Sequence, residues 1–595
     1  MAARAPFVLL DDARESGAAD AHLFESPRDV FIARRADEVA GVLVAADAAR
    51  QAGGTLAGYI AYEAGLALEP KVAGLADART GAGGPLVWLG LFDDARTIPA
   101  GEVEGWLAER GGGAASLGPL APQVSTGAYA AAFAALQEAI RAGDIYQANL
   151  TLPLAGSFRG DPLALYTALR GDAKSGYGGV IWDGQHWLLS LSPELFVSLK
   201  EGEAKAKPMK GTRPRGGTSK EDVAMAEELA QSVKDKAENL MIVDLMRNDL
   251  SRVAEAGTVR VEAPFAVETY PTLHTMTTTV RARLAEGRGA MDLVRALFPC
   301  GSITGAPKIR AMELIGNVER DARGPYCGAI GRIEHDGDAA FNVAIRTLRL
   351  TEIENAHGSA VLGVGGAIVA DSEAMPEWRE AIVKAGFAGR TAAGFDLIEA
   401  MKFDPETGVE FIELHLERIK ASAAALNFAF DRHAARNRIQ ALCFDLEAPA
   451  KVRLLLAKSG AIALEAQPLG ATPATMTAIA LPLPVDPGDL RLAHKTSDRW
   501  FYDAGTDAAR EAGADTAIFV RDDGLVTEAM NATLFVEREG VLLTPPASLG
   551  LLPGVLRRSL LESGQAREAE LTLDDLAGGF LLGNSVRALV PARLL

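Results

Sequence analysis

The sequence predicts an α+β fold, because strand-like runs come in groups, a few long helical stretches separate the groups, and strands and helices do not alternate regularly. In the first part of the chain, residues 187–191 and 195–199 are short apolar runs typical of strands. Between residues 225 and 241, apolar residues recur every three or four positions, with acids and lysines between them. This spacing predicts one amphipathic helix.

Two stretches rich in Gly, Ala and Pro divide the chain. Residues 111–122 lack apolar periodicity and are expected to form a surface connection. The helical stretch that begins near Met375 is expected to end around residues 386–394, so we place the main boundary there. The expected domains are residues 1–388, of which 1–125 are less typical, and residues 389–595. In the second domain we expect strands at 395–399, 451–456 and 516–520, a turn at 522–524 and an amphipathic helix at 414–426.

Charge and composition exclude several classes of function. The 595 residues include 78 acidic and 60 basic side chains, a formal net charge of −18, without a long run of Lys or Arg. We therefore expect no nucleic-acid partner and no polybasic membrane patch. The three cysteines have no CxxC spacing, and the apolar run at residues 6–10 is too short for a signal peptide or a membrane span. A cytoplasmic protein that binds small molecules or other proteins is expected.

The most basic stretch lies between Lys200 and Arg215. In an acidic protein it indicates a site for an anionic small molecule, although a solvated hairpin with a basic rim has the same composition. Within it, Lys210 stands beside Gly211, where the backbone can approach a ligand closely. A lysine becomes a nucleophile when burial or nearby cations favour its neutral amine, and we expect the neighbouring arginines to help.

Three glutamates form an acidic counterpart. Glu377 and Glu380 are three residues apart, so they share a face of a helix, and Glu238 follows the apolar stripe of the helix predicted above. Oxygen ligands from two helices, completed by substrate oxygens, suit Mg²⁺. Taken singly, each glutamate is more typical of a solvated helix position than of a metal ligand.

Seven segments in order then resemble a known family: Ser192–Glu194, residues 207–216, 238–250, 301–315, 326–331, 345–348 and 365–372. They are similar to the motifs of the chorismate-utilising enzymes, which include anthranilate, aminodeoxychorismate, isochorismate and salicylate synthases. The resemblance covers roughly residues 50 to 388. It implies a large α+β domain of antiparallel sheets that enclose the site.

Two positions distinguish members of this family. Isochorismate and salicylate synthases have a lysine base where this chain has Gln147, and anthranilate synthases usually have alanine where this chain has Lys210. Aminodeoxychorismate synthases have lysine at the second position. The first domain therefore most resembles the aminodeoxychorismate synthases.

The resemblance implies roles for individual residues. Lys210 would attack C2 of chorismate while Glu194 acts as general acid on the departing C4 hydroxyl, and ammonia would then enter at C4. Mg²⁺ would be held by Glu238 and Glu380, with Glu377 nearby. His274 matches a family histidine near the ring. The other implied substrate-binding residues are Gln147, Thr304, Tyr326, Arg346, Gly365 and Gly366.

No cysteine stands in a glutaminase-type nucleophile motif. Ammonia is therefore expected from a separate glutamine amidotransferase subunit or from solution.

The second domain resembles the class IV aminotransferases, which use pyridoxal 5′-phosphate, in the segments 414–419, 493–499, 526–529, 552–557 and 583–585. By this resemblance Lys495 forms the Schiff base with the cofactor and Glu528 pairs with its pyridine nitrogen. The residues implied to hold the phosphate are Arg418, the backbone at Val555 and Leu556, and Asn584 and Ser585.

Two departures from the class IV pattern leave the second activity open. The family commonly has asparagine five residues after the glutamate, where this chain has Thr533, and its Asn531 is displaced by two. The smaller subdomain is also shortened. We expect an aminodeoxychorismate lyase that forms 4-aminobenzoate and pyruvate for folate synthesis, with an amino-acid transaminase or a non-catalytic module as the alternatives.

Overall fold

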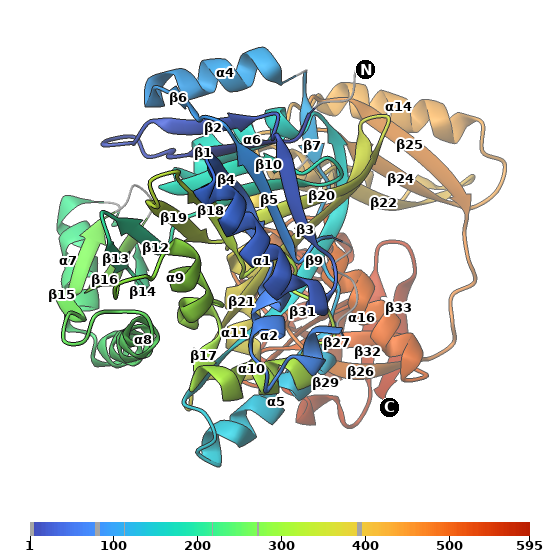
Figure 1. The fold of residues 1–595 in the computed structure, drawn as a ribbon. Coiled ribbons are helices and arrows are strands. Elements are labelled where there is room, and N and C mark those ends of the chain that lie inside the picture. Colours follow the sequence, from blue (N-terminus) through green and yellow to red (C-terminus); the bar gives the residue numbers. More distant parts are fainter. Residues whose placement is uncertain (1–4, 78–83, 112, 217, 270–272, 390–394) are drawn as a thin grey trace. The chain divides into compact units, whose positions relative to one another are not determined.

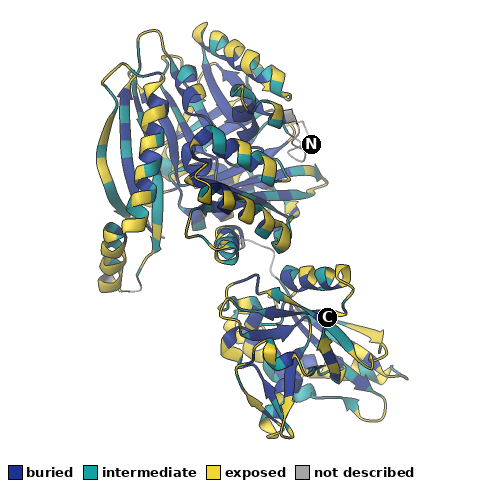
Figure 2. Ribbon diagram, turned by 90° about the horizontal axis from the view of Figure 1, so that it is seen from below, coloured by how far each residue is buried: buried dark blue, intermediate teal, exposed yellow. Residues whose placement is uncertain are grey.

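The computed structural model describes residues 5–77, 84–111, 113–216, 218–269, 273–389 and 395–595. The chain forms two compact units, residues 1–392 and 393–595, and each is described by itself. Figure 2 shows the buried residues concentrated in the strands of each unit. No helix in the described residues is long and apolar enough to span a membrane.

The first unit contains two large antiparallel sheets, as its α+β pattern predicts. An eleven-stranded sheet has the order β17-β9-β21-β20-β11-β10-β1-β2-β6, with β7 and β8 also paired to β9. Its strands are β1 (Phe7–Asp11), β2 (Ala21–Glu25), β6 (Arg96–Ile98), β7 (Ala115–Leu117), β8 (Ala121–Pro122), β9 (Gln147–Gly160), β10 (Tyr177–Trp182), β11 (Trp187–Ser192), β17 (Gly305–Ala306), β20 (Thr347–Glu354) and β21 (His357–Ile368).

A ten-stranded sheet has the order β14-β16-β13-β12-β19-β18-β4-β5-β3, with β15 paired to β16. Its strands are β3 (Asp29–Ala33), β4 (Thr55–Ile60), β5 (Val87–Phe92), β12 (Leu195–Lys200), β13 (Glu203–Ala206), β14 (Met209–Pro214), β15 (Arg260–Thr269), β16 (Leu273–Arg283), β18 (Ala329–Ile333) and β19 (Ala339–Val343). The predicted strands at 187–191 and 195–199 are confirmed as β11 and β12.

The helices of the first unit are α1 (Ala36–Gln51), α2 (Tyr62–Leu68), α3 (Gly74–Asp77), α4 (Val103–Arg110), α5 (Thr126–Arg141), α6 (Pro162–Ala173), α7 (Ser219–Gln231), α8 (Val233–Ser251), α9 (Ala290–Leu297), α10 (Lys308–Val318), α11 (Ala374–Val383) and α12 (Gly386–Gly389). In Figure 1, α7 and α8 lie beside the end of the sheet that carries β14 and β16.

The single helix predicted for residues 225–241 is wrong. The helix is interrupted at Ser232, whose ψ of 115° is not helical. The Ser232 hydroxyl caps α8 by accepting from the Asp235 N–H at 3.2 Å. The apolar stripe does not face the core along its whole length: Leu229 of α7 is fully buried, but Val233 is 81% exposed and Leu240 50%. Instead, α8 buries a face shifted along the helix, with the side chains of Ile242, Val243, Met246 and Leu250.

One expectation about connections is corrected and one agrees with the structure. Residues 111–122 are more than a surface connection, because β7 and β8 pair with β9 and extend the sheet. The helical stretch that begins near Met375 forms α11 and then the short α12, whose last described residue, Gly389, lies in the expected range. Residues 390–394 lie outside the described part of the chain.

The second unit has a four-stranded antiparallel sheet and an eight-stranded mixed sheet. The smaller sheet contains β22 (Leu397–Asp404), β23 (Gly408–Val409), β24 (Ala450–Leu456) and β25 (Ile462–Pro468). The larger contains β26 (Met476–Pro482), β27 (Thr516–Val520), β28 (Val526–Ala529), β29 (Thr533–Arg538), β30 (Val541–Thr544), β31 (Ala566–Glu568), β32 (Phe580–Asn584) and β33 (Ala588–Leu594). The helices are α13 (Ile412–Ala425), α14 (Arg432–Phe444), α15 (Leu490–Ala493), α16 (Trp500–Glu511) and α17 (Val555–Glu562).

Candidate active sites of the two units

In the first unit, Lys210 and Glu194 come from segments far apart along the chain and interact electrostatically. Lys210 belongs to β14, and Glu194 lies in the turn between β11 and β12, 4% exposed. Burial raises the pKa of Glu194 to about 7, although Ser302 and Lys210 both oppose this rise. Burial also lowers the pKa of Lys210, against the effect of Glu238 and Glu194. Both shifts favour a neutral amine beside a neutral carboxylic acid.

Ser302 orients the acid. It belongs to the short 3₁₀ turn Gly301–Ile303, and its hydroxyl donates to Glu194 Oε1 at 2.8 Å. Ser302 is 5% exposed and also lies 3.3 Å from the Cys300 thiol. A carboxyl group fixed in this way keeps one orientation, as a general acid requires.

The cation that lowers the pKa of Lys210 is Lys384, and our expectation that the neighbouring arginines do so is not met. Arg213 is bonded to Glu228 and Asp235, and Arg215 to Asp222. Both arginines are therefore engaged in ion pairs that hold α7 and α8 against β14.

Lys384, which directly follows α11, connects this helix with β21, the strand that contains Gly365 and Gly366. Its Nζ donates to the Gly365 carbonyl at 2.9 Å and forms an ion pair with Glu380 Oε1 at 2.9 Å. A Cβ at Gly366 would lie 3.2 Å from Glu377 Oε2 and 3.5 Å from the Lys384 ammonium. Because residue 366 is a glycine, no side chain occupies the space beside these two charged groups.

The three predicted Mg²⁺ ligands have suitable chemistry but are not assembled as a complete site. Ser372 Oγ donates to Glu377 Oε1 at 2.7 Å, and Glu380 faces Lys384. Within the described residues no group of three acidic, His or Cys side chains stands ready to hold a metal. Burial raises the pKa of both Glu238 and Glu377, which a nearby cation would reverse. The oxygen donors fit Mg²⁺ if a ligand's own oxygens complete the shell.

Two polar side chains without partners indicate a ligand. Gln147 is fully buried, and neither its amide oxygen nor its nitrogen has a hydrogen-bond partner among the described residues. Burial alone lowers the pKa of Arg346, whose guanidinium makes no hydrogen bond or ion pair with another described residue. A desolvated cation of this kind is costly unless an anion reaches it.

The remaining substrate-binding candidates differ in their availability. The ring of Tyr326 packs against Gly363, where a Cβ would approach it to 2.2 Å. The hydroxyl of Thr304 donates to the Cys300 carbonyl at 2.8 Å. His274 bonds Asp222 through Nε2 and Thr269 through Nδ1, each at 2.9 Å, so both of its ring nitrogens are occupied.

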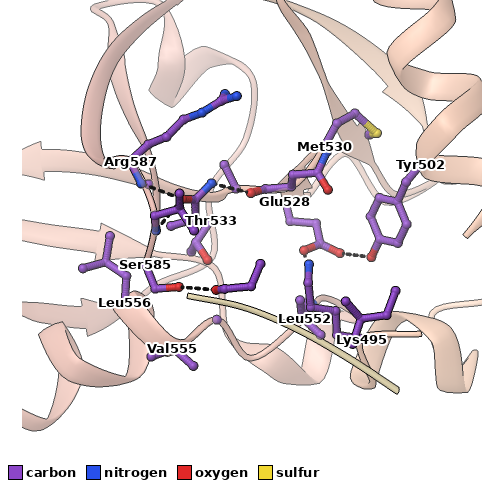
Figure 3. A pocket seen from close by; sticks show the side chains of 18 of the residues that line it. Lys495, Tyr502, Glu528, Met530, Thr533, Leu552, Val555, Leu556, Ser585 and Arg587 are labelled. Carbon is purple, nitrogen blue, oxygen red and sulfur yellow. Dashed lines mark hydrogen bonds between the residues drawn. The ribbon is translucent and has the colours of Figure 1, made fainter. Parts of the chain in front are cut away.

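In the second unit, a cavity of about 770 Å³ contains Lys495 and Glu528 (Figure 3). Burial lowers the pKa of Lys495 to about 8, and Arg418 and Arg499 act in the same direction. The predicted lysine is therefore half-buried and partly neutral near physiological pH, as an amine that bonds to an aldehyde must be.

Glu528 is held by a tyrosine that sequence reasoning missed. Tyr502 of α16 donates its hydroxyl to Glu528 Oε1 at 2.5 Å, and the Leu552 N–H donates to Oε2 at 3.3 Å (Figure 3). Burial raises the pKa of Glu528 to about 7, and the bond from Tyr502 opposes this rise. The carboxyl group can thus accept or share a proton with a ring nitrogen in the cavity.

The phosphate end of a pyridoxal phosphate fits the start of α17. Gly554 precedes the helix, so the N–H groups of Val555 and Leu556 have no partner within it. Thr533 faces the same place, since a Cβ at Gly554 would lie 2.8 Å from its hydroxyl. The Thr533 hydroxyl is therefore available where the family commonly has asparagine.

The other phosphate candidates are partly engaged in the structure. Arg418 bonds Glu399 at 2.9 and 2.6 Å, and with His415 it holds the Glu399 pKa at about 2 despite burial. Asn584 uses both ends of its amide within the polypeptide, and the Ser585 hydroxyl donates to the Ala400 carbonyl at 3.3 Å. Arg418 is thus positioned by Glu399, another residue that sequence reasoning missed.

Comparison with known proteins assigns the first unit. Residues 6–389 match the family described as chorismate binding enzyme. The chain belongs to the chorismate binding enzymes. Residues 396–595 match the family described as amino-transferase class IV, so a class IV domain follows the chorismate binding domain.

Individual relatives agree with this assignment. The chain is 43% identical over 256 residues to aminodeoxychorismate synthase component 1 of Klebsiella aerogenes, covering 43% of this chain and 56% of that protein. It is 42% identical over 254 residues to anthranilate synthase component 1 of Streptomyces coelicolor, covering 42% and 48%. The chain thus spans about half the length of the curated relatives it matches.

A solved isochorismate synthase specific for 2,3-dihydroxybenzoate, from Bacillus anthracis, shares the fold of the chorismate binding unit. The TM-score is 0.51 at 21% identity, over 66% of this chain and 97% of that one.

Proposed function

We propose that the chain aminates chorismate to 4-amino-4-deoxychorismate and then expels pyruvate to give 4-aminobenzoate, for folate synthesis in the cytoplasm. The first step belongs to residues 1–388 and the second to residues 389–595. The observation that carries the proposal is the half-buried Lys210, which interacts electrostatically with the buried Glu194. Relatives of both synthase types are about equally similar to the chain, at 43% and 42%, so overall identity does not choose between them. Lys210 does, because the anthranilate synthases usually have alanine there.

In the first step, the neutral Lys210 amine forms a bond to C2 of chorismate. Both ring double bonds shift, from C1=C2 to C1=C6 and from C5=C6 to C4=C5, and the C4–O bond breaks. Glu194 gives its proton to the departing hydroxyl, which leaves as water. Ammonia then bonds to C4, both ring double bonds shift back, and the bond between C2 and Lys210 breaks. Arg346 binds a carboxylate of the substrate.

The pH dependence of the first step follows from these two groups. Glu194 must be protonated, so kcat/KM should fall as the pH rises through about 7, its pKa. Lys210 must be neutral, so the rate should also fall towards low pH, which gives a bell-shaped profile. Glu194→Gln should lower the rate by about 10²-fold or more and remove the alkaline limb. A variant that keeps the alkaline limb would assign that limb to another group.

Metal dependence tests the three glutamates. Glu238→Gln removes a negative oxygen ligand, so the Mg²⁺ concentration for half-maximal first-step activity should rise about tenfold or more, and Glu380→Gln should act in the same direction. Glu373→Gln, just before α11, is a matched control that should leave the Mg²⁺ titration unchanged. An unchanged titration in both test variants would exclude them as ligands.

In the second step, Lys495 holds the cofactor and, once free, is the base that removes the proton from the amine-bearing carbon C4. Bound pyridoxal phosphate supplies an electron sink for this proton removal. Glu528, oriented by Tyr502, pairs with the ring nitrogen, while Arg418, Thr533 and the start of α17 bind the phosphate. Breaking the bond between C3 and oxygen then releases pyruvate and leaves an aromatic ring.

One assay tests the whole proposal. The purified chain, given chorismate, ammonium, Mg²⁺ and pyridoxal phosphate, should form 4-aminobenzoate and pyruvate in equal amounts. Glutamine should replace ammonium only after a separate amidotransferase is added, because no cysteine of the chain stands in a glutaminase motif. Turnover with glutamine alone would contradict the proposed partner, and formation of anthranilate would contradict the proposed first step.

A further inference from the structure

The cavity of the second unit has more positive charge than its own acids neutralise. Each acidic residue that lines it already has a partner within the unit. These pairs are Asp498 with Arg491 at 3.2 Å, Asp503 with Arg499 at 3.4 Å, Asp515 with Thr477 at 2.9 Å, and Glu528 with Tyr502 at 2.5 Å.

Besides the arginines paired with these acids and the residues proposed to hold the cofactor, three other cationic side chains line the cavity, two from the smaller sheet and one from the larger sheet. Lys451 and Arg453 are two residues apart on β24, so their side chains share one face of the smaller sheet. Arg587 comes from the connection between β32 and β33 in the larger sheet. The side chains of Arg587 and Lys451 make no hydrogen bond or ion pair with another described residue, and Arg453 has only a 3.6 Å contact with Glu465.

The backbone that carries Arg587 is fixed. Asn584 Oδ1 accepts from the N–H groups of Val586 and Arg587, both at 2.9 Å, and Asn584 Nδ2 donates to the Asn531 carbonyl at 2.9 Å. Figure 3 shows Arg587 on the opposite side of the pocket from Lys495. The guanidinium is therefore available to a ligand without any rearrangement of the connection.

The cofactor phosphate does not account for these cations, because it is already provided for by Arg418, Thr533 and the start of α17. We propose that Arg587 on one wall, and Lys451 with Arg453 on the other, bind the two carboxylates of a dianionic cyclic amine. This inference rests on the proposed function and names its substrate class.

The covalent structure of aminodeoxychorismate agrees with this arrangement. Both of its carboxylate carbons are four bonds away from the carbon that bears the amine. When that carbon lies at Lys495, the two charges can extend towards the walls. An α-amino acid instead has its carboxylate on the amine-bearing carbon, beside Lys495. The cations at the walls therefore favour the dianionic substrate over substrates of a transaminase.

The test uses the full chain loaded with pyridoxal phosphate, whose visible absorbance reports on the second unit alone. The probes are 3-(carboxymethoxy)benzoate, which has two carboxylates, and benzoate, which has one. We expect the dicarboxylate to bind about tenfold more tightly to the unaltered protein. Arg587→Met should lower that affinity about tenfold without changing the affinity for pyridoxal phosphate, and Arg587→Lys should restore part of it.

Arg593→Met is the matched control, because Arg593 is exposed on β33 and does not line the cavity. If the visible band is present but the unaltered protein does not prefer the dicarboxylate, the inference is overturned while the cofactor site stands. A loss of pyridoxal phosphate affinity in Arg587→Met would make Arg587 a phosphate ligand and would also overturn it. If the unaltered chain has no visible band, the proposed second step fails, and the inference fails with it.

Discussion

Lys210→Ala is expected to lower aminodeoxychorismate formation by a factor on the order of 10³ or more, with ammonium as the nitrogen donor. The substitution removes the only group that we place for bonding to C2, so ammonia can no longer enter at C4 by displacing it. It also removes the cation that lowers the pKa of Glu194, so that pKa should rise further. Product analysis by chromatography would measure both the loss and any ammonia addition at C2.

Lys205→Ala is the matched control for this variant. Lys205 lies on β13 in the same basic stretch, and its side chain is partly buried, but Glu194 and Glu238 do not act on its pKa as they do on that of Lys210. It should retain most of the activity. Near-normal synthesis by Lys210→Ala would refute covalent catalysis in the first unit.

Lys495→Ala should accumulate aminodeoxychorismate from chorismate and ammonium, with 4-aminobenzoate reduced by a factor on the order of 10³ or more. The variant lacks both the amine that bonds to the cofactor and the base at C4. The first step should run at its usual rate, since its residues belong to the other unit. Following 4-aminobenzoate and pyruvate over time, with no other lyase present, measures the effect.

Lys458→Ala serves as control because Lys458 is an exposed lysine just after β24. Its product ratio should equal that of the unaltered chain. Undiminished 4-aminobenzoate in Lys495→Ala, or an unaltered chain that transaminates amino acids and stops at aminodeoxychorismate, would favour the transaminase alternative.

Local sequence pattern was sufficient for much of the fold. The strands at 451–456 and 516–520 and the helix at 414–426 are confirmed as β24, β27 and α13, because short apolar runs and amphipathic spacing are local signals. The break at Ser232 was not predictable from periodicity. The apolar stripe continued through it, while the buried face of α8 is determined by its packing against β16, including the bond from Thr278 to Asn239 at 2.6 Å.

For the two candidate sites, too, the sequence predicted local features but not contacts between residues far apart along the chain. Motif resemblance named Lys210, Glu194, Lys495 and Glu528, but it could not show which neighbours shift their pKa values, since those lie far away along the chain. Ser302 is 108 residues from Glu194. Two partners are close along the chain to residues that the motifs name, and this proximity could have indicated them. Lys384 is one helical turn after Glu380, and Tyr502 follows Lys495 by seven positions.

The presence of both units in one polypeptide also has a consequence for the cell. Translation makes the two units in equal numbers, so their stoichiometry cannot be adjusted by separate gene expression. If each unit performs its proposed step, the steady-state level of the intermediate depends on the two turnover rates and on the KM of the second step, and not on protein abundance. A mutation that slows the second unit alone would therefore raise that level at every expression level, and making more of the protein would not correct it.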